Sequence, residues 1–414
     1  MKKIQNTLIG AAIALTSFQA AALPFAGVDA RSLGMGGTGV AGGSVANAAS
    51  FNPALLAASR EGEDFNFSLA FGALAKDEYN MVDAVDALQA PNALGFDLVQ
   101  QFSADIDAYI ASPSTTTADP VIASGGALKT NLLNLNNRPL ELGVNFGLNV
   151  TVPGETLGMS VFANSRGVAA GSVFIDPADL AAIDAVVTAV SASGPTADPF
   201  ASGTLSGTSN FTLTGAAVTE VGVALGTKLF GLALGVTPKQ VQIDSISSIQ
   251  QINAASTSFP DTGETFSDTN FDVGVAIDLG ALKIGGVAKN MVSKEYPLIG
   301  GNRIIIEPQL RAGVSFDAGW ATLTMDQDLT TNKGVISTGV AAIDALSETQ
   351  YTSLGVEFDM SIVQLRAGMR TDNTGNTDDV LTAGVGLHAL VSLDFAVAGN
   401  DKGVEAILQA GVRW

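Results

Sequence analysis

The sequence predicts an all-β protein: a transmembrane antiparallel β-barrel of about 14 strands, with an N-terminal plug in its lumen and helical insertions in its loops. The chain is apolar, with a mean hydropathy of +0.33 and only 14% charged residues. A helical membrane protein of this composition would contain long apolar stretches, and none of 18 residues follows the N-terminal region. The apolar residues instead alternate with small or polar ones, as strands with one lipid-facing side require.

The first 22 residues have the pattern of a secretory signal peptide. Lys2 and Lys3 precede an apolar stretch at 8–18, and three alanines at 20–22 supply small residues for cleavage. A buried N-terminal helix is the alternative, which this order of segments disfavours. We expect the mature protein to begin near Leu23 and to reach the outer membrane of a Gram-negative bacterium after Sec-type export.

Charge and cysteine content exclude several functions. Without residues 1–22 the chain has 18 basic and 40 acidic side chains, a formal charge of −22. Such a chain repels nucleic acid, whose binding depends on neutralising phosphates. Because the sequence contains no cysteine, it excludes disulfides, thiolate metal sites and thiol catalysis.

Alternation with a period of two recurs from about residue 140 onward. In 270–280, Phe271, Val273 and Val275 alternate with Asp272 and Gly274. The same pattern occurs in 219–226, 310–317 and 363–370. Since successive side chains on a strand point to opposite faces, one face is apolar and the other small or charged. A soluble sandwich would give the same alternation.

The lengths of the connections favour a membrane barrel over a sandwich. Long links and short turns alternate after a first strand at 65–75, and long loops on one side with short turns on the other are typical of outer-membrane barrels. Both barrel ends then lie on the short-turn, periplasmic side. The long links are expected at about 76–139, 176–208, 248–269, 293–305, 330–350 and 372–379, and the turns at 153–155, 226–228, 280, 317–319 and 360–361.

The last strand, 404–414, resembles the signal read by the barrel-insertion machinery, because it alternates and ends in an aromatic residue. Its apolar face consists of Val404, Ala406, Leu408, Ala410, Val412 and Trp414. Trp320 follows another predicted short turn on the same side. We therefore expect both tryptophans in one interfacial girdle; ordinary core tryptophans are the alternative.

Two long loops, 76–139 and 176–208, are expected to be partly helical. Residues 178–190 form one apolar helix candidate, and 93–111 form another. These helices either pack on their own loop or over the barrel mouth, or they form an extracellular lid or apolar entrance for a lipophilic ligand. The apolar residues of 93–111 at helical spacing are Leu94, Leu98, Phe102, Ile106 and Ile110.

Gly34, Gly36 and Gly39 match the dinucleotide-binding pattern G-x-G-x-x-G, which has meaning only between a buried strand and a helix. The preceding residues, 23–33, contain Pro24, Gly27 and two charged residues, and do not predict a strand. The following residues, 40–50, contain two glycines that disfavour a helix. We reject the dinucleotide interpretation.

The stretch 30–57, ARSLGMGGTGVAGGSVANAASFNPALLA, resembles the N-terminal signature of the FadL-like outer-membrane superfamily. That superfamily includes fatty-acid and hydrocarbon channels and PorV-type proteins. The wording FNPALLA is most similar to the conjugal-transfer TraF-like subgroup. The resemblance implies a 14-stranded barrel at 60–414 with residues 23–59 folded inward as a plug, or hatch.

The implied plug motif has a physical purpose. Its glycines permit tight turns and close backbone approach. The Asn52 amide can bond exposed peptide groups, and Pro53 fixes the backbone beside it. The alternative is that these residues only shape the plug. The motif consists of Arg31, Gly34, Gly36, Gly37, Gly39, Asn52 and Pro53.

Arg311, Arg366, Arg370 and His388 fall on inward faces and are the lumen candidates. The arginines either grip a ligand carboxylate or form ion pairs, and we favour ion pairs. Their expected inward partners are Asp272, Asp278, Asp317, Asp394 and Glu405.

Catalysis, a cofactor and a metal site are not expected. An outer-membrane phospholipase needs a nucleophilic serine beside a positioned histidine, and the residues around His388, the single histidine, do not resemble the motif of that enzyme family. The run 372–379, DNTGNTDD, lacks the order of a calcium-binding EF-hand loop. The sequence therefore favours a barrel that binds and passes a small hydrophobic molecule. A structural or assembly component of a conjugation or secretion apparatus is the alternative.

Overall fold

The structure, a computed structural model, describes residues 28–58, 65–77, 80–93, 95–136, 138–198, 209–251, 263–297, 303–333, 336–337, 348–389 and 391–413. The predicted signal peptide, the first residues of the predicted plug, Leu94 and Trp414 lie outside the described residues. Their expected roles stay predictions.

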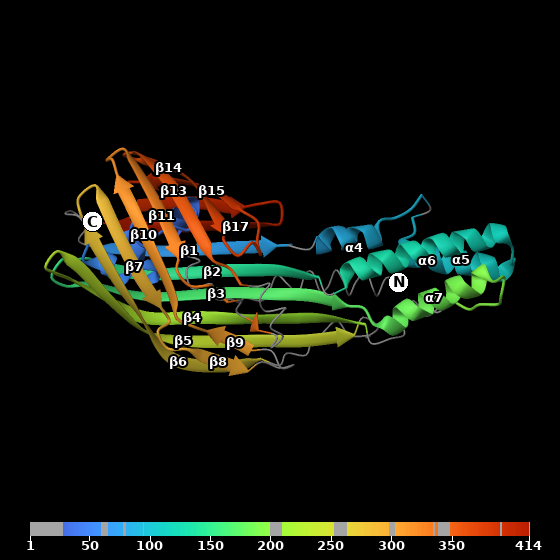
Figure 1. Cartoon of the computed structure of the whole chain (residues 1–414). Helices are drawn as coiled ribbons and strands as arrows, with labels where there is room; N and C mark the ends of the chain where they lie inside the picture. Colours follow the sequence, from blue (N-terminus) through green and yellow to red (C-terminus); the bar gives the residue numbers. More distant parts are fainter. Residues whose placement is uncertain are drawn as a thin grey trace.

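Fourteen antiparallel strands form a closed barrel, which confirms the predicted fold (Figure 1). β1 closes the barrel by pairing with β17, with Asn66 opposite Arg413, so both ends of the wall lie on the same side. The strands of the wall are β1 (Asn66–Lys76), β2 (Pro139–Val152), β3 (Gly158–Phe174), β4 (Asn210–Leu229), β5 (Leu232–Gln251), β6 (Glu264–Asp278), β7 (Leu282–Lys289), β10 (Gln309–Asp317), β11 (Ala321–Asp328), β13 (Tyr351–Met360), β14 (Val363–Asp372), β15 (Val380–His388), β16 (Val391–Gly399) and β17 (Gly403–Arg413).

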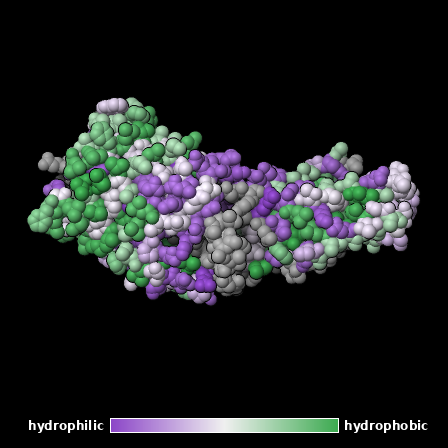
Figure 2. Space-filling view, viewed as in Figure 1, coloured by the Kyte–Doolittle hydropathy of each residue, from purple (hydrophilic) through white to green (hydrophobic). Residues whose placement is uncertain are grey.

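The two faces of the wall differ in polarity, in the predicted phase. On β6, Phe271, Val273 and Val275 are 36–38% exposed on the outer face, whereas Asp272 is 2% exposed on the inner face. Figure 2 shows apolar surface gathered over the barrel wall and polar surface between it and the helices. The outward residues form an apolar belt around the outer face of the wall.

Short turns join strands on one side of the barrel, near residues 153–157, 279–281, 318–320 and 361–362, as predicted. The turn predicted at 226–228 is wrong: β4 continues to Leu229, and the turn is Phe230–Gly231. Lys228 still pairs with Ala233 of β5. Gly226 is needed for a different reason, because a Cβ there would lie 2.9 Å from atoms of the N-terminal chain inside the barrel.

Strand length differs between the two halves of the wall. β3, β4 and β5 have 17–20 residues, whereas β7, β10 and β11 have 8–9. A small sheet of β8 (Lys294–Pro297), β9 (Arg303–Ile306) and β12 (Ile336–Ser337) packs on the inner face of the long half. These short strands lie within expected links and were not predicted. The apolar contact joins Tyr296, Ile304 and Ile306 to Ala216, Val218, Val241 and Ile243.

Four helices form a projection that extends away from the barrel (Figure 1). They are α4 (Met81–Gln89), α5 (Leu98–Ala111), α6 (Thr115–Leu135) and α7 (Pro177–Ser191), here called the helical projection. Phe102 and Ile106 of α5 belong to one apolar core with Val121 of α6, Ile183 of α7 and Phe211 of β4. The helices thus pack on one another and on the extended wall. Among the described residues, no helix is long and apolar enough to cross a membrane.

The sequence identifies two of these helices. The helix expected at 93–111 begins at Leu98, because the Asp97 carboxylate caps it by accepting from Gln100 N at 2.8 Å. The helix expected at 178–190 is α7. α4 and α6 were missed; α6 contains Pro120 in its second turn and two adjacent glycines, which lower its intrinsic helix propensity. Its packing in the shared core stabilises it instead.

Replacing Phe102 by alanine should loosen the helical projection and leave the barrel intact. Phe102 is fully buried, so its truncation costs about 3–5 kcal/mol of local stability. Hydrogen exchange should speed up in α5, α6 and α7, while heat-modifiable migration of the barrel on a gel is unchanged. Ile110→Ala is the control, because Ile110 of the same helix is 47% exposed. Equal exchange in both variants would contradict the shared core.

Candidate functional site: a lumen filled by the N-terminal segment

The described N-terminal segment, residues 28–58, lies inside the barrel. Its elements are α2 (Ala30–Gly34), η2 (Val45–Asn47), α3 (Ala48–Phe51) and η3 (Pro53–Leu56). α2 contacts β14 to β17, η2 contacts β1 and β2, and η3 contacts β4, β5 and β6. The segment is rich in glycine and alanine, and most of its residues are buried. The segment therefore spans the lumen from one part of the wall to the other.

Two side chains shape the segment locally. The Asp29 carboxylate caps α2 by accepting from Arg31 N at 3.2 Å and Ser32 N at 3.3 Å. Burial raises the pKa of this carboxyl above its ordinary value, and the neighbouring Arg31 opposes that rise. Asn52 is fully buried; its amide donates to Val40 O within the segment and to Val275 O of the wall, at 2.8 and 3.1 Å. Asn52 thus joins two parts of the segment to β6.

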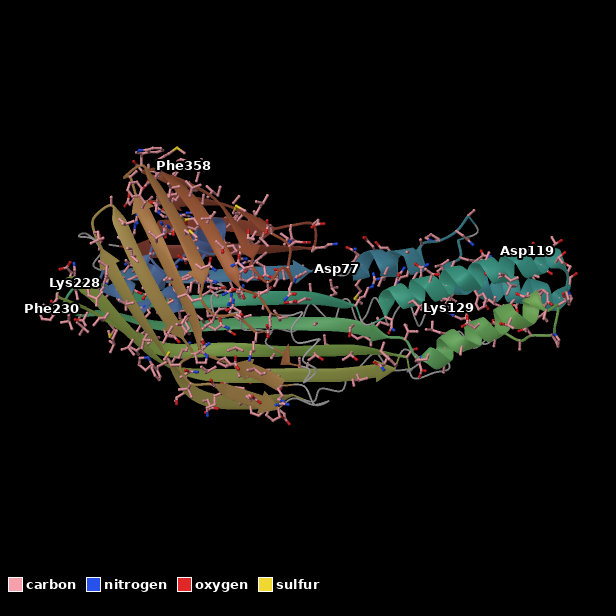
Figure 3. All side chains as sticks on the ribbon, in the orientation of Figure 1. Asp77, Asp119, Lys129, Lys228, Phe230 and Phe358 are labelled. Carbon is pink, nitrogen blue, oxygen red and sulfur yellow. The ribbon has the colours of Figure 1, made fainter. Side chains whose placement is uncertain are left out.

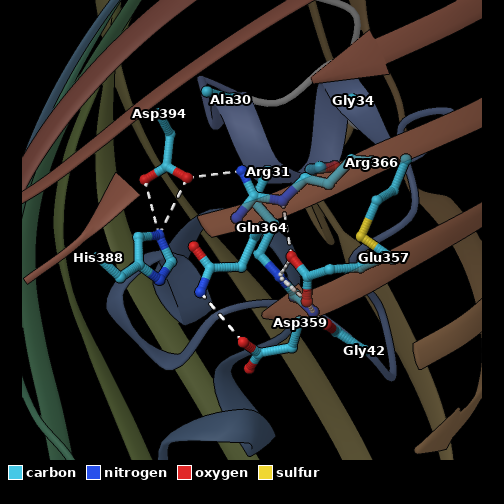
Figure 4. Close-up of polar contacts among 12 residues, drawn as sticks. Ala30, Arg31, Gly34, Gly42, Glu357, Asp359, Gln364, Arg366, His388 and Asp394 are labelled. Carbon is cyan, nitrogen blue, oxygen red and sulfur yellow. Dashed lines mark hydrogen bonds and ion pairs between the residues drawn. The ribbon is translucent and has the colours of Figure 1, made fainter. Parts of the chain in front are cut away.

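A chain of polar contacts between buried and partly buried side chains ties α2 to the wall (Figure 4). Arg31 donates to both carboxylate oxygens of Glu357, at 2.7 to 3.1 Å. Arg366 donates to Glu357 at 2.6 Å and to Asp394 at 2.5 Å. His388 Nε2 lies 3.1 Å from Asp394 Oδ1. Although burial opposes its charge, Glu357 raises the pKa of the Arg31 guanidinium above its ordinary value.

The middle of the segment is held through its backbone. The Asp326 carboxylate accepts from Gly39 N at 2.7 Å and from Val40 N at 3.0 Å. Arg311 donates to Gly37 O at 3.3 Å while it pairs with Asp328 at 2.5 Å. These contacts satisfy peptide groups that would otherwise be buried without partners, which costs about 1–3 kcal/mol each.

Glycine at the interface lets the backbones of segment and wall approach each other. Gly36 has φ +75°, and a Cβ there would lie 2.5 Å from the carbonyl oxygens of Leu354 and Met369. The wall also contributes glycines on its inner face. A Cβ at any of them would clash with the segment; they are Gly235, Gly274, Gly285, Gly355 and Gly368, opposite Pro53, Asn52, Val40, Met35 and Gly36 respectively.

The predicted site residues form two groups in space. The plug motif residues Arg31, Gly34, Gly36, Gly37, Gly39, Asn52 and Pro53 all lie in the segment and meet the wall. The four lumen candidates face inward but do not converge. Arg366 and His388 share Asp394, Arg311 pairs with Asp328, and the Arg370 guanidinium lies 4.9 Å from the Tyr351 ring centroid. Of the acids expected as partners, Asp394 is the one that binds Arg366.

One protein family matches the chain over residues 49–328, and it is described as "F plasmid transfer operon, TraF, protein". This match covers more than half of the chain. The chain belongs to this TraF family. The matched region begins inside α3 and includes Asn52 and Pro53. A search of curated protein sequences finds no match.

The TraF-family chain is similar in fold to solved structures that include a hydrocarbon channel and a toluene transporter. It is 12% identical to the "CymD monoaromatic hydrocarbon channel" (TM-score 0.53) over 95% of this chain and 99% of that one. It is 13% identical to the Ralstonia pickettii toluene transporter TbuX (TM-score 0.53) over 95% and 100%. A Pseudomonas aeruginosa FadL homologue is 10% identical (TM-score 0.50) over 96% and 99%. At these identities the likeness shows a FadL-like fold.

The part of the TraF-family barrel that the structure describes contains no group of three His, Cys, Asp or Glu side chains placed to hold a metal. In the loop 372–379, Asp372 instead holds its own loop, accepting from Thr374 N and Thr377 N at 3.1 Å. It also accepts from Gln350 N at 2.8 Å. The Asp372 carboxylate thus stabilises the turn in its own loop.

Sequence reasoning found Arg311 on the wall side of this interface but missed other wall residues that contact the segment. Glu357 and Asp326 contact the segment, and neither was singled out. The alternation along β13 and β11 could have identified these two residues, because both occupy positions that face inward. The wall glycines gave the same signal: Gly274 and Gly355 each lie on an inward phase, where a glycine leaves room for a neighbouring backbone.

Proposed function

We propose that this protein is an outer-membrane channel that binds a small hydrophobic molecule and passes it through the barrel. The observation that carries the proposal is a closed barrel whose lumen holds the chain's own N-terminal segment. Such a segment closes the lumen and is still a separate element that can shift. The fold likeness to proteins described as hydrocarbon channels supports an apolar ligand.

The proposed route begins at the apolar surfaces of the long loops and continues into the lumen. Release occurs past a shifted N-terminal segment, the plug, or through the wall, and a concentration gradient drives it. Arg311, Arg366 and His388 position the plug in this scheme, since their partners are carboxylates of the wall and the plug backbone. A shift of the plug requires Arg31 to exchange Glu357 for water or another anion.

The proposed location is the outer membrane of a Gram-negative bacterium, after Sec-type export and removal of residues 1–22. The apolar belt on the outer face supports contact with outer-membrane lipid. The alternating strand β17 supports recognition by the barrel-insertion machinery. No catalysis, cofactor or nucleic-acid binding is proposed.

Expression of the chain in a Gram-negative host without hydrocarbon channels should raise the initial rate of labelled toluene uptake several-fold. Toluene is the probe because a neighbour in fold is described as a toluene transporter. The chain lacks cysteine, so Asn47→Cys and Ser68→Cys can be bridged by a reversible bis-methanethiosulfonate; Asn47 Oδ1 and Ser68 Oγ are 3.0 Å apart. Bridging should slow uptake, and a reductant should restore it.

Three outcomes separate the alternatives. If uptake rises and is insensitive to bridging of the plug to the wall, the ligand leaves through the wall. Uptake that never exceeds that of cells with an unrelated barrel contradicts transport. Stoichiometric co-purification with other envelope proteins, without uptake, supports the second candidate function.

The second candidate is a structural or assembly component of a conjugation or secretion apparatus. Two observations favour it: the chain belongs to a family described by an F plasmid transfer operon, and the helical projection extends away from the barrel. A projection that shares an apolar core with the extended wall is a packed element that a partner can bind.

A further inference from the structure

Phe230, at the β4–β5 turn, has an unusual combination of conformation and exposure. Its φ is +51°, and the residue is fully exposed. A left-handed backbone disfavours bulky residues, and asparagine or glycine is the usual choice at this position of a two-residue turn. Gly231, with φ +83°, fits the turn in the ordinary way. No contact within the described chain compensates for the strained aromatic residue.

Phe230 continues the apolar outer face of its hairpin. Val221 and Leu229 on β4, and Leu234 and Val236 on β5, are 36–50% exposed on that face. The hairpin reaches the turn side of the molecule, where Phe230 lies at the very end (Figure 3). The hairpin tip is also fixed to its neighbour, because Lys228 N donates to Glu155 O at 2.8 Å.

Four other turns on this side each expose a large apolar side chain as well. Leu157, Leu279, Trp320 and Ile362 are 62–67% exposed and belong to four different turns around the barrel. A binding site for a protein partner would gather its apolar residues on one part of the barrel's turn side. A ring of apolar turns matches the interfacial region of a bilayer, which surrounds a barrel on all sides.

We propose that Phe230 is a lipid anchor: the β4–β5 turn inserts its phenyl ring into the periplasmic leaflet of the membrane and sets the depth of this wall. Burial of the ring in lipid then offsets the free-energy cost of the left-handed backbone at Phe230. The inference rests on the proposed membrane location and is independent of any transported ligand.

Single-tryptophan variants reconstituted in phospholipid vesicles test the anchor. Trp320→Phe and Trp414→Phe remove the native tryptophans, and Phe230→Trp adds the reporter. Its emission should be quenched at least twofold by lipids brominated on the acyl chain, and only weakly by aqueous acrylamide. Ser112→Trp, in the connection between α5 and α6 of the helical projection, is the matched control and should show the reverse.

A Phe230→Trp reporter that acrylamide quenches and bromolipid does not would overturn the anchor and indicate a free or protein-binding turn. A second variant, with Trp414→Phe alone, keeps Trp320 as its single tryptophan. It tests the membrane location separately from the Phe230 anchor. The Trp320 ring stacks on Phe358 of the outer wall, with the ring centroids 6.0 Å apart, and should respond to bromolipid whichever turn inserts. If Trp320 also fails to respond, the membrane location itself is wrong.

Discussion

Replacing Glu357 by alanine should release α2 from the wall and cost about 3–5 kcal/mol in the free energy of unfolding. Glu357 is 8% exposed and binds two guanidinium groups, from Arg31 and Arg366. Its removal leaves the buried Arg366 and the partly buried Arg31 next to each other with one carboxylate fewer. Urea unfolding in detergent micelles measures the loss, and limited proteolysis of the N-terminal segment reports its release.

Glu155→Ala is the control for this effect. Glu155 pairs with Lys228 at 2.5 Å, but the two side chains are 64% and 31% exposed. Exposed pairs contribute about 0–1 kcal/mol, so this variant should unfold almost as the unchanged protein does. A Glu357 variant that resembles Glu155→Ala in stability and in proteolysis would show that the charge chain does not hold the segment.

Replacing Gly36 by alanine should displace the segment by a different route. The new methyl group would lie 2.5 Å from the Leu354 and Met369 carbonyl oxygens, both of them backbone atoms that cannot rotate away. The left-handed conformation costs alanine about 1–2 kcal/mol, and overpacking adds about 1–3 kcal/mol. Once the segment is displaced, ions can enter the lumen, so conductance across planar bilayers should rise well above that of the unchanged protein.

Gly126→Ala is the matched substitution, because Gly126 lies in α6 with no atom within 4 Å of an added Cβ. Alanine is favoured over glycine in a helix by about 1 kcal/mol, so this variant should be at least as stable and equally closed. A Gly36 variant with unchanged conductance and unchanged stability would mean that the segment can shift within the lumen at little cost.

The barrel was predictable because its signal is local and repeated. Every strand of a membrane barrel must alternate, so single windows such as 270–280 already carry the information. The error at 226–228 shows the limit of this reasoning. Gly226 predicts a turn on local grounds, but it is glycine because the N-terminal segment passes close to it.

The interface between segment and wall was only half predictable. The segment has a dense motif of glycines and Asn52-Pro53, which resembles a known signature. Its partners are scattered over strands far apart in the sequence: Glu357 lies 326 residues from Arg31, and Asp326 lies 287 residues from Gly39. Barrel closure decides which inward residues face each segment residue, and no short window contains that information.

The unequal wall has a mechanical consequence. β3 pairs with β4 without a break from Gly158↔Gly226 to Phe174↔Asn210, and β4 continues to the turn at Phe230. The chain leaves Phe174 for α7, so a pull on the helices acts along the strand axis. Force in that direction loads all the hydrogen bonds of the ladder at once, in shear, and does not open them one at a time. The long half of the wall is therefore suited to carry tension from the helical projection along the barrel wall.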